Sequence, residues 1–189
     1  MRTMGLVFTL GVALGQPTLW ERHMNEGDVA EQAGRYQQAK AAYRLALRDE
    51  ERPSDSGFRQ ASAWNNLALI NRYLGHYPEA RQQYRHALAL FEKTRGSRSP
   101  EYASALHNLA ALDYKEGQLD EAAQQFRQAL LIREEVLGEI HPATAQTLNS
   151  LAAVRRPGTI CGGGAVVQAC FGNRRKGAGT GTRPGFGHP

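Results

Sequence analysis

Side chains that could carry catalysis are sparse in this chain of 189 residues. It has no H-E-x-x-H motif of zinc proteases, no G-x-S-x-G motif of serine hydrolases and no Walker lysine motif of phosphate-binding loops. His107 and His141 have no second histidine or carboxylate placed to complete a metal site, so we interpret them as a surface polar group and a linker residue. Cys161 and Cys170 fit neither a zinc site nor a disulfide framework. The sequence predicts no enzyme, no metal and no cofactor.

Recognition of phosphate or nucleic acid has equally little support. The glycine-rich stretches at 162–164 and 177–181 neither follow a strand nor open a helix, as a phosphate loop must. Residues 1–156 hold 19 of the 23 basic side chains and all 18 acidic ones, so this part is close to neutral. The basic run at 174–176 is short and has no aromatic platform beside it. We therefore expect no nucleic-acid partner.

The first fifteen residues resemble a signal peptide. Arg2 precedes an apolar stretch from Met4 to Gly15, and the small residues Ala13 and Gly15 precede a cleavage point before Gln16. This pattern predicts a signal peptide at 1–15 and an exported protein, either secreted or periplasmic. The alternative is an N-terminal helix packed on the repeats of a cytoplasmic protein. No apolar run reaches the length that spans a bilayer, so we expect no membrane association beyond the signal peptide.

The composition changes abruptly near the C-terminus. Residues 157–189 contain 10 of the 20 glycines, four basic residues and no acidic residue or leucine. Such a segment buries too little apolar surface to offset its ordering entropy, so we expect a disordered Gly/Arg-rich tail. Our hypothesis for its origin is that a further repeat is translated in a shifted reading frame from about residue 155 onward, which the codons of the gene would test.

Between the two ends the sequence repeats itself. Asn66-Leu67-Ala68 recurs 42 residues later as Asn108-Leu109-Ala110 and again as Ser150-Leu151-Ala152. The same offset relates Gly75 to Gly117, Tyr84 to Phe126 and Pro100 to Pro142, and an offset of 41 finds an earlier copy around Asn25, Gly34 and Tyr43. Apolar residues within each unit recur at helical spacing, each first helix is followed by a glycine, and Pro78, Pro100 and Pro142 mark helix starts. Each unit is predicted to be a helix–turn–helix hairpin that buries its apolar face only by stacking on neighbours.

These units resemble tetratricopeptide repeats. The residues that stand at the spacing of that pattern in one unit are Trp64, Leu67, Ala68, Gly75, Tyr77, Ala80, Tyr84 and Ala87. The 42-residue period and His141-Pro142 after Gly138 look like the longer variant in kinesin light chains. The resemblance implies an all-α, right-handed α-solenoid over residues 16–156, with three full repeats and the first helix of a fourth. Asn71 and Asp113 replace an aromatic residue that is frequent in the pattern.

In the family, the first helices of successive hairpins line a concave face that takes peptides. The resemblance assigns nine residues to this groove: Asn25, Asn65, Asn66, Arg72, His107, Asn108, Tyr114, Lys115 and Asn149. A side-chain amide both donates and accepts, so the recurring asparagines can pair with a peptide backbone whatever its sequence. Arg72 and Lys115 can pair with an acidic group on the partner. Alternatively, the asparagines bond neighbouring backbone and hold hairpin to hairpin.

Two functions from different classes follow. The first is a non-catalytic scaffold that binds a protein or peptide ligand in the concave groove. The second is a structural role, in which the chain is a truncated segment of a longer solenoid and self-associates through the incomplete fourth repeat.

Overall fold

The computed structural model describes residues 17–49 and 56–155, and in these ranges all regular secondary structure is α-helix. The predictions for the signal peptide at 1–15 and for the tail at 157–189 lie outside the described residues. The helices are α1 (Leu19–Gln32), α2 (Tyr36–Ala46), α3 (Ser56–Tyr73), α4 (Tyr77–Arg95), α5 (Pro100–Lys115), α6 (Leu119–Leu137) and α7 (Pro142–Arg155). None of the helices in the described ranges is long and apolar enough to cross a bilayer.

Local signals in the sequence set the helix ends. Thr18 forms a capping box with Glu21: its hydroxyl accepts from the Glu21 amide, and the Glu21 carboxylate accepts from the Thr18 amide. At α5 the Ser99 hydroxyl accepts from the Tyr102 amide, and Pro100 fills the first helical position, where no amide hydrogen is needed. The turn between α5 and α6 contains Gly117 at φ 80°, a conformation that only glycine adopts without strain.

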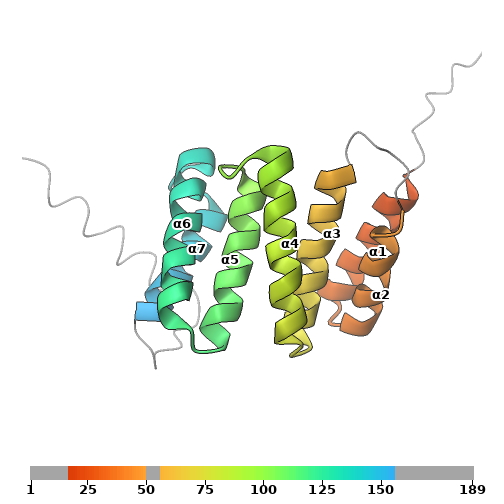
Figure 1. Cartoon of the computed structure of the whole chain (residues 1–189), viewed down its shortest axis with the longest axis horizontal. Helices are drawn as coiled ribbons and strands as arrows, with labels where there is room; N and C mark the ends of the chain where they lie inside the picture. The colour runs from red at the N-terminus through yellow and green to blue at the C-terminus, as the bar shows by residue number, and fades with distance from the viewer. Residues whose placement is uncertain (1–16, 50–55, 156–189) are drawn as a thin grey trace, which may run out of the picture.

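The helices pair into hairpins α1–α2, α3–α4 and α5–α6, with α7 packed on the last one, and the hairpins stack in chain order along one axis (Figure 1). Across hairpins, α3 also contacts α5 and α5 contacts α7, whereas the second helices α2, α4 and α6 make no comparable contact with one another. The first helices α3, α5 and α7 therefore lie closer together than the second helices do, and their side is the inner side of the stack. This is the all-α solenoid that the sequence predicts.

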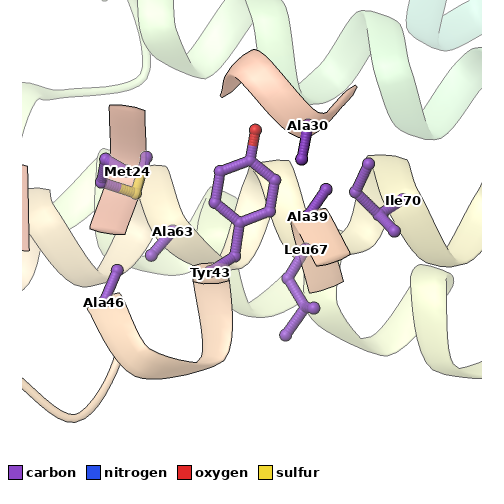
Figure 2. Packing of buried hydrophobic residues seen from close by; sticks show 8 residues of the cluster. All are labelled: Met24, Ala30, Ala39, Tyr43, Ala46, Ala63, Leu67 and Ile70. Atoms are coloured by element: carbon purple, nitrogen blue, oxygen red, sulfur yellow. The ribbon is translucent and has the colours of Figure 1, made fainter. Parts of the chain in front are cut away.

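The core is divided among the hairpins and their junctions. In the first hairpin the ring of Tyr43 is fully buried and is surrounded by small and aliphatic side chains (Figure 2), namely Met24, Ala30, Ala39, Ala46, Ala63, Leu67 and Ile70. Ala63, Leu67 and Ile70 belong to α3, so the first hairpin completes its core with a helix of the second. Tyr84 and Phe126, the counterparts of Tyr43, are equally buried. Burial across junctions explains why the units stack.

Candidate functional site

A row of polar side chains crosses the first three odd-numbered helices. Asn108 of α5 donates from Nδ2 to Asn65 Oδ1 at 3.2 Å, Asn65 of α3 donates to Asn66 Oδ1 at 3.2 Å, and Asn66 donates to Asp28 Oδ1 of α1 at 3.4 Å. We call these four residues the amide row. All of them are partly exposed, and because an amide has two N–H donors and a carbonyl, each asparagine retains bonding capacity for a ligand.

The amide row ends on a carboxylate that is held in place. The buried hydroxyl of Tyr43 donates to Asp28 Oδ1 at 2.7 Å and to Glu31 Oε2 at 3.1 Å. Burial, the neighbouring carboxylates and these hydrogen bonds raise the pKa of Tyr43, so its proton stays in place. Burial also raises the pKa of Glu31, against the hydrogen bond from Tyr43. Asp28 is a member of the row that the sequence reasoning missed, because it does not recur in the other repeats.

The structure thus brings together Asn65, Asn66 and Asn108 among the predicted groove residues. The bonds from Asn108 to Asn65 and from Asn66 to Asp28 run from side chain to side chain between hairpins, not to backbone, so part of the amide capacity holds the stack together. Asn25 is exposed on α1 and Asn149 is half-buried on α7, and their assignment to the groove stays a prediction.

The cationic and aromatic members of the predicted set lie at the ends of their helices. The Arg72 guanidinium lies 4.9 Å from the ring centre of Tyr73, and Lys115 Nζ lies 5.9 Å from the ring centre of Tyr77 in the preceding hairpin. Tyr114 packs against the core cluster that contains Phe126. Intramolecular contacts therefore occupy these three side chains, while Lys115 remains exposed to a partner.

His107 is not the surface group or groove residue that the sequence predicts. Only 6% of it is exposed, because the Phe126 ring packs edge-on at 5.1 Å and Thr147 Oγ1 lies 3.3 Å from its Nδ1. Burial, together with the positive charges of Arg133 and Arg72, lowers the pKa of His107 to about 3. The imidazole is therefore neutral and part of the junction with α7. The other histidine, His141, is exposed in the linker before α7, where its Nδ1 accepts from the Ala143 amide at 3.1 Å.

Beside His107 lies a buried arginine. Arg133 of α6 is 4% exposed, and it donates from Nη1 to the Ala143 carbonyl at 2.8 Å and to Thr147 Oγ1 at 2.6 Å. Its Nη2 donates to Ser104 Oγ at 3.2 Å. No carboxylate in the described ranges forms an ion pair with Arg133, and burial lowers the pKa of its guanidinium. Sequence reasoning missed it, because a lone arginine within a helical pattern reads as a solvated side chain.

A pocket of about 240 Å³ adjoins the amide row between α3, α4 and α5. It is lined by Ser62, Asn65, Asn66, Phe91, Pro100, Glu101 and Ser104. Two members of the amide row therefore form one wall, and a carboxylate and two hydroxyls line the rest together with an apolar surface. This combination suits a polar ligand group that carries hydrogen-bond donors.

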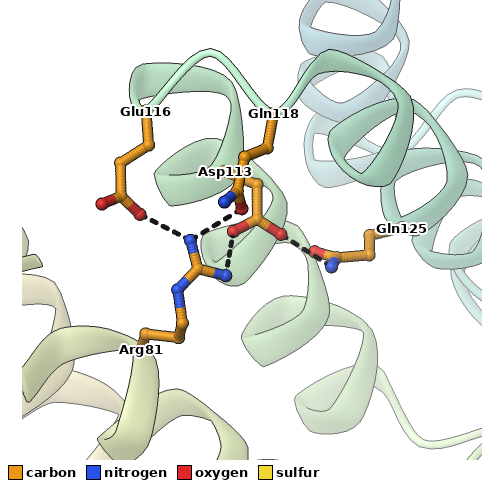
Figure 3. A network of polar contacts seen from close by, with 5 residues as sticks. All are labelled: Arg81, Asp113, Glu116, Gln118 and Gln125. Carbon is orange, nitrogen blue, oxygen red and sulfur yellow. Dashed lines mark hydrogen bonds and ion pairs between the residues drawn. The ribbon is translucent and has the colours of Figure 1, made fainter. Parts of the chain in front are cut away.

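A second polar network holds the third hairpin to the second. Figure 3 shows Arg81 of α4 reaching across the junction, where its guanidinium pairs with Asp113 of α5 and with Glu116 just after α5, each at 2.5 Å, and donates to Gln118 Oε1 at 3.0 Å. Asp113 is 1% exposed and also accepts from Gln125 Nε2 at 2.8 Å. Burial lowers the pKa of Arg81, but the bonds and charges of Glu116 and Asp113 outweigh it and raise that pKa. This network is structural, since the charged groups of Arg81, Asp113 and Glu116 pair with one another.

Within the described ranges, no group of three histidine, cysteine, aspartate or glutamate side chains is arranged to hold a metal ion. The amide row and the pocket, by contrast, offer hydrogen-bonding chemistry to a ligand.

Comparison with solved structures finds the same fold. BtubC from P. vanneervenii superposes with a TM-score of 0.65 at 23% identity, covering 94% of this chain and 73% of that one. The TPR2B domain of yeast Sti1 has a TM-score of 0.59 at 15% identity, over 72% of this chain and 96% of the domain. The repeats of a Podosopora anserina kinesin light chain have a TM-score of 0.61 at 21% identity, over 75% of this chain and 67% of theirs.

Comparison with curated proteins gives no match. Tetratricopeptide-repeat families match residues 21–48, 59–135 and 103–156, which span most of the helical part. The matched stretches contain the amide row, the pocket and the Arg81 network. The chain belongs to the tetratricopeptide repeat family.

Proposed function

We propose that the chain is a non-catalytic interaction scaffold that binds an extended protein or peptide segment along the inner face of the stack. The observation that carries this proposal is the amide row, which presents partly exposed amides from α3 and α5 beside a pocket. Amides pair with a peptide backbone through both its N–H and its C=O groups. The structure of the similar Sti1 domain, determined as a complex with pHsp70, supports a protein or peptide ligand.

Removal of the row's asparagines tests the proposal. A binding peptide is first selected from a displayed random-peptide library against the full chain, and its affinity is measured by calorimetry. Asn66→Ala combined with Asn108→Ala is expected to weaken this peptide, since each lost hydrogen bond costs about 0.5–1.5 kcal/mol. Gln82→Ala, which removes an exposed amide from the second helix α4, is the matched control and is expected to leave the affinity unchanged.

The two interpretations of the asparagines differ in this experiment. A scaffold role predicts that the double variant of Asn66 and Asn108 loses more binding free energy than unfolding free energy. An equal loss of binding and unfolding free energy would contradict binding in the groove and favour a purely structural role for the amide row. The same would follow if Gln82→Ala weakened the peptide as much as the double variant does.

A second candidate is self-association through α7. The buried residues Ala103, Leu106 and Ala110 of α5 have their counterparts in Ala145, Leu148 and Ala152, which are only half-buried in α7. Apolar surface of this kind favours association with a further repeat or a second copy. Concentration-dependent mass in analytical ultracentrifugation that Leu148→Glu abolishes would support it, and a monomer at all concentrations would contradict it.

Export remains part of the proposal. The signal-peptide pattern in residues 1–15 supports it. A mature chain that begins at Gln16 outside the cytoplasm of a bacterial host is the expected result, and an intact Met1 in the cytoplasm would contradict it.

A further inference from the structure

The pocket beside the amide row has a negative charge that no cation of the described chain neutralises. Glu101 is half-buried in the pocket lining, and no arginine, lysine or histidine in residues 17–49 or 56–155 forms an ion pair with it. A carboxylate in a partly desolvated position binds a cation more strongly than one in open water does.

One of the two hydroxyls in the lining presents an acceptor to the pocket. Ser62 Oγ donates its proton to the Phe58 carbonyl at 3.0 Å, and Ser104 Oγ donates to the Pro100 carbonyl at 2.9 Å, so both protons are used within their own helices. Ser104 Oγ already accepts from Arg133 Nη2, so the lone pairs of Ser62 Oγ and the carboxylate of Glu101 are the acceptors left for a ligand. A guanidinium is the complementary group, because it has five N–H donors and no acceptor.

The next junction of the same chain already holds such a group. At the 42-residue offset Ser62 corresponds to Ser104, Glu101 to Ala143, and Phe91 to Arg133. There the Arg133 guanidinium donates to Ser104 Oγ and to the Ala143 carbonyl, so it contacts two positions that correspond to pocket-lining positions. In the junction before it, Phe91 replaces the arginine, and a pocket with an acidic wall takes the place of the internal cation.

From these observations we propose that the pocket takes the guanidinium of an arginine side chain of the bound peptide, with Glu101 as its counter-ion. The inference rests on the proposed function and adds the chemistry of one partner residue to it. The Phe91 ring in the wall supplies an apolar surface to the planar group.

The test uses small probes, so that it does not depend on a selected peptide. N-acetyl-arginine amide is titrated into the isotope-labelled full chain, and the side-chain amide resonances of Asn65 and Asn66 are followed by NMR. N-acetyl-citrulline amide, which has the same shape without the charge, is the matched probe. We expect saturable shifts with the arginine probe only, and an affinity at least about tenfold lower in Glu101→Gln, as for a lost charged hydrogen bond.

Glu92→Gln is the matched protein control, because it removes the same charge from an exposed position of α4 outside the pocket. Its affinity for the arginine probe is expected to equal that of the unmodified chain. Equal shifts with citrulline, equal weakening by Glu92→Gln, or no shift at Asn65 and Asn66 would each overturn the proposal. The scaffold function would still stand if the selected peptide bound through Asn66 and Asn108 while Glu101→Gln left its affinity unchanged.

Discussion

Gly27 leaves room for the Tyr43 ring in the first hairpin. A Cβ added at Gly27 would overlap the Tyr43 ring, whose Cδ1 would be 2.6 Å away, and hydrogen bonds to Asp28 and Glu31 hold that ring in place. We predict that Gly27→Ala destabilises the chain by about 1–3 kcal/mol, as overpacking does, although alanine favours a helix. Urea unfolding measures the effect. Tyr43→Phe frees the ring from its hydrogen bonds. The double variant Gly27→Ala with Tyr43→Phe should therefore lose less unfolding free energy than the two single variants lose together. Strictly additive losses would contradict this explanation.

Buried His107 makes stability depend on pH. Its pKa falls from the ordinary value of 6.5 to about 3 in the folded chain, so the unfolded chain binds more protons between these values. Stability therefore rises with pH through this window and is lost as the pH falls below about 6.5. From pH 7 to about pH 5 the loss attributable to this residue is about 2 kcal/mol.

The variant His107→Asn isolates that contribution, since asparagine is the residue at the equivalent position 65. The unfolding free energies of the two chains are measured by urea titration from pH 7 downward. The value for the unmodified chain minus the value for His107→Asn should fall by about 2 kcal/mol between pH 7 and about pH 5. A pH-independent difference for His107→Asn would show that this imidazole becomes protonated within the folded chain.

At the scale of elements, the Arg81 network joins the second and third hairpins. Arg81→Ala leaves the Asp113 carboxylate buried with only Gln125 to bond it. Breaking a buried ion pair in this way is expected to cost about 3–5 kcal/mol in unfolding free energy. A compensating substitution is suggested by the second hairpin. There Asn71 occupies the position equivalent to Asp113, and its uncharged amide donates to Gln83 at 2.7 Å. Arg81→Ala with Asp113→Asn should therefore recover part of the loss in thermal unfolding, whereas no recovery would mean that Arg81 acts mainly through Glu116 and Gln118.

The elements themselves were largely predictable from sequence. Helical apolar spacing, the glycine after each first helix and the prolines at helix starts correspond to the observed hairpins, because caps and periodicity act locally. Partners across a junction were not predictable. Asn65 and His107 occupy the same repeat position, yet only His107 is buried, because Phe126 and Thr147 pack on it from two other helices. The contacts of Asp28, Glu101 and Arg133 were not predictable either, since each involves a neighbouring hairpin.

At the scale of the whole molecule, the junctions differ in chemistry. Where the C-terminal half of α4 meets the N-terminal half of α5 the contact is apolar, with Phe91 packed among Ala61, Ala87 and Ala105, while the Arg81 network lies at the opposite ends of these two helices. Between α6 and the first turns of α7 it is polar, made by the hydrogen bonds of Arg133. A stack of similar units is therefore held together by two kinds of interaction.

This difference has a thermal consequence. Apolar burial weakens on cooling, because its driving force near room temperature is entropic, whereas hydrogen bonds carry no such penalty. On cooling from 25 °C to near 0 °C, we expect the protection of backbone amides against hydrogen exchange to fall more in the N-terminal half of α5 than at the start of α7. A uniform change along the chain would contradict this. In the cold the N-terminal half of α5 would then loosen from α4 first, while the Arg81 network kept the other end of that junction closed and α7 stayed on the third hairpin.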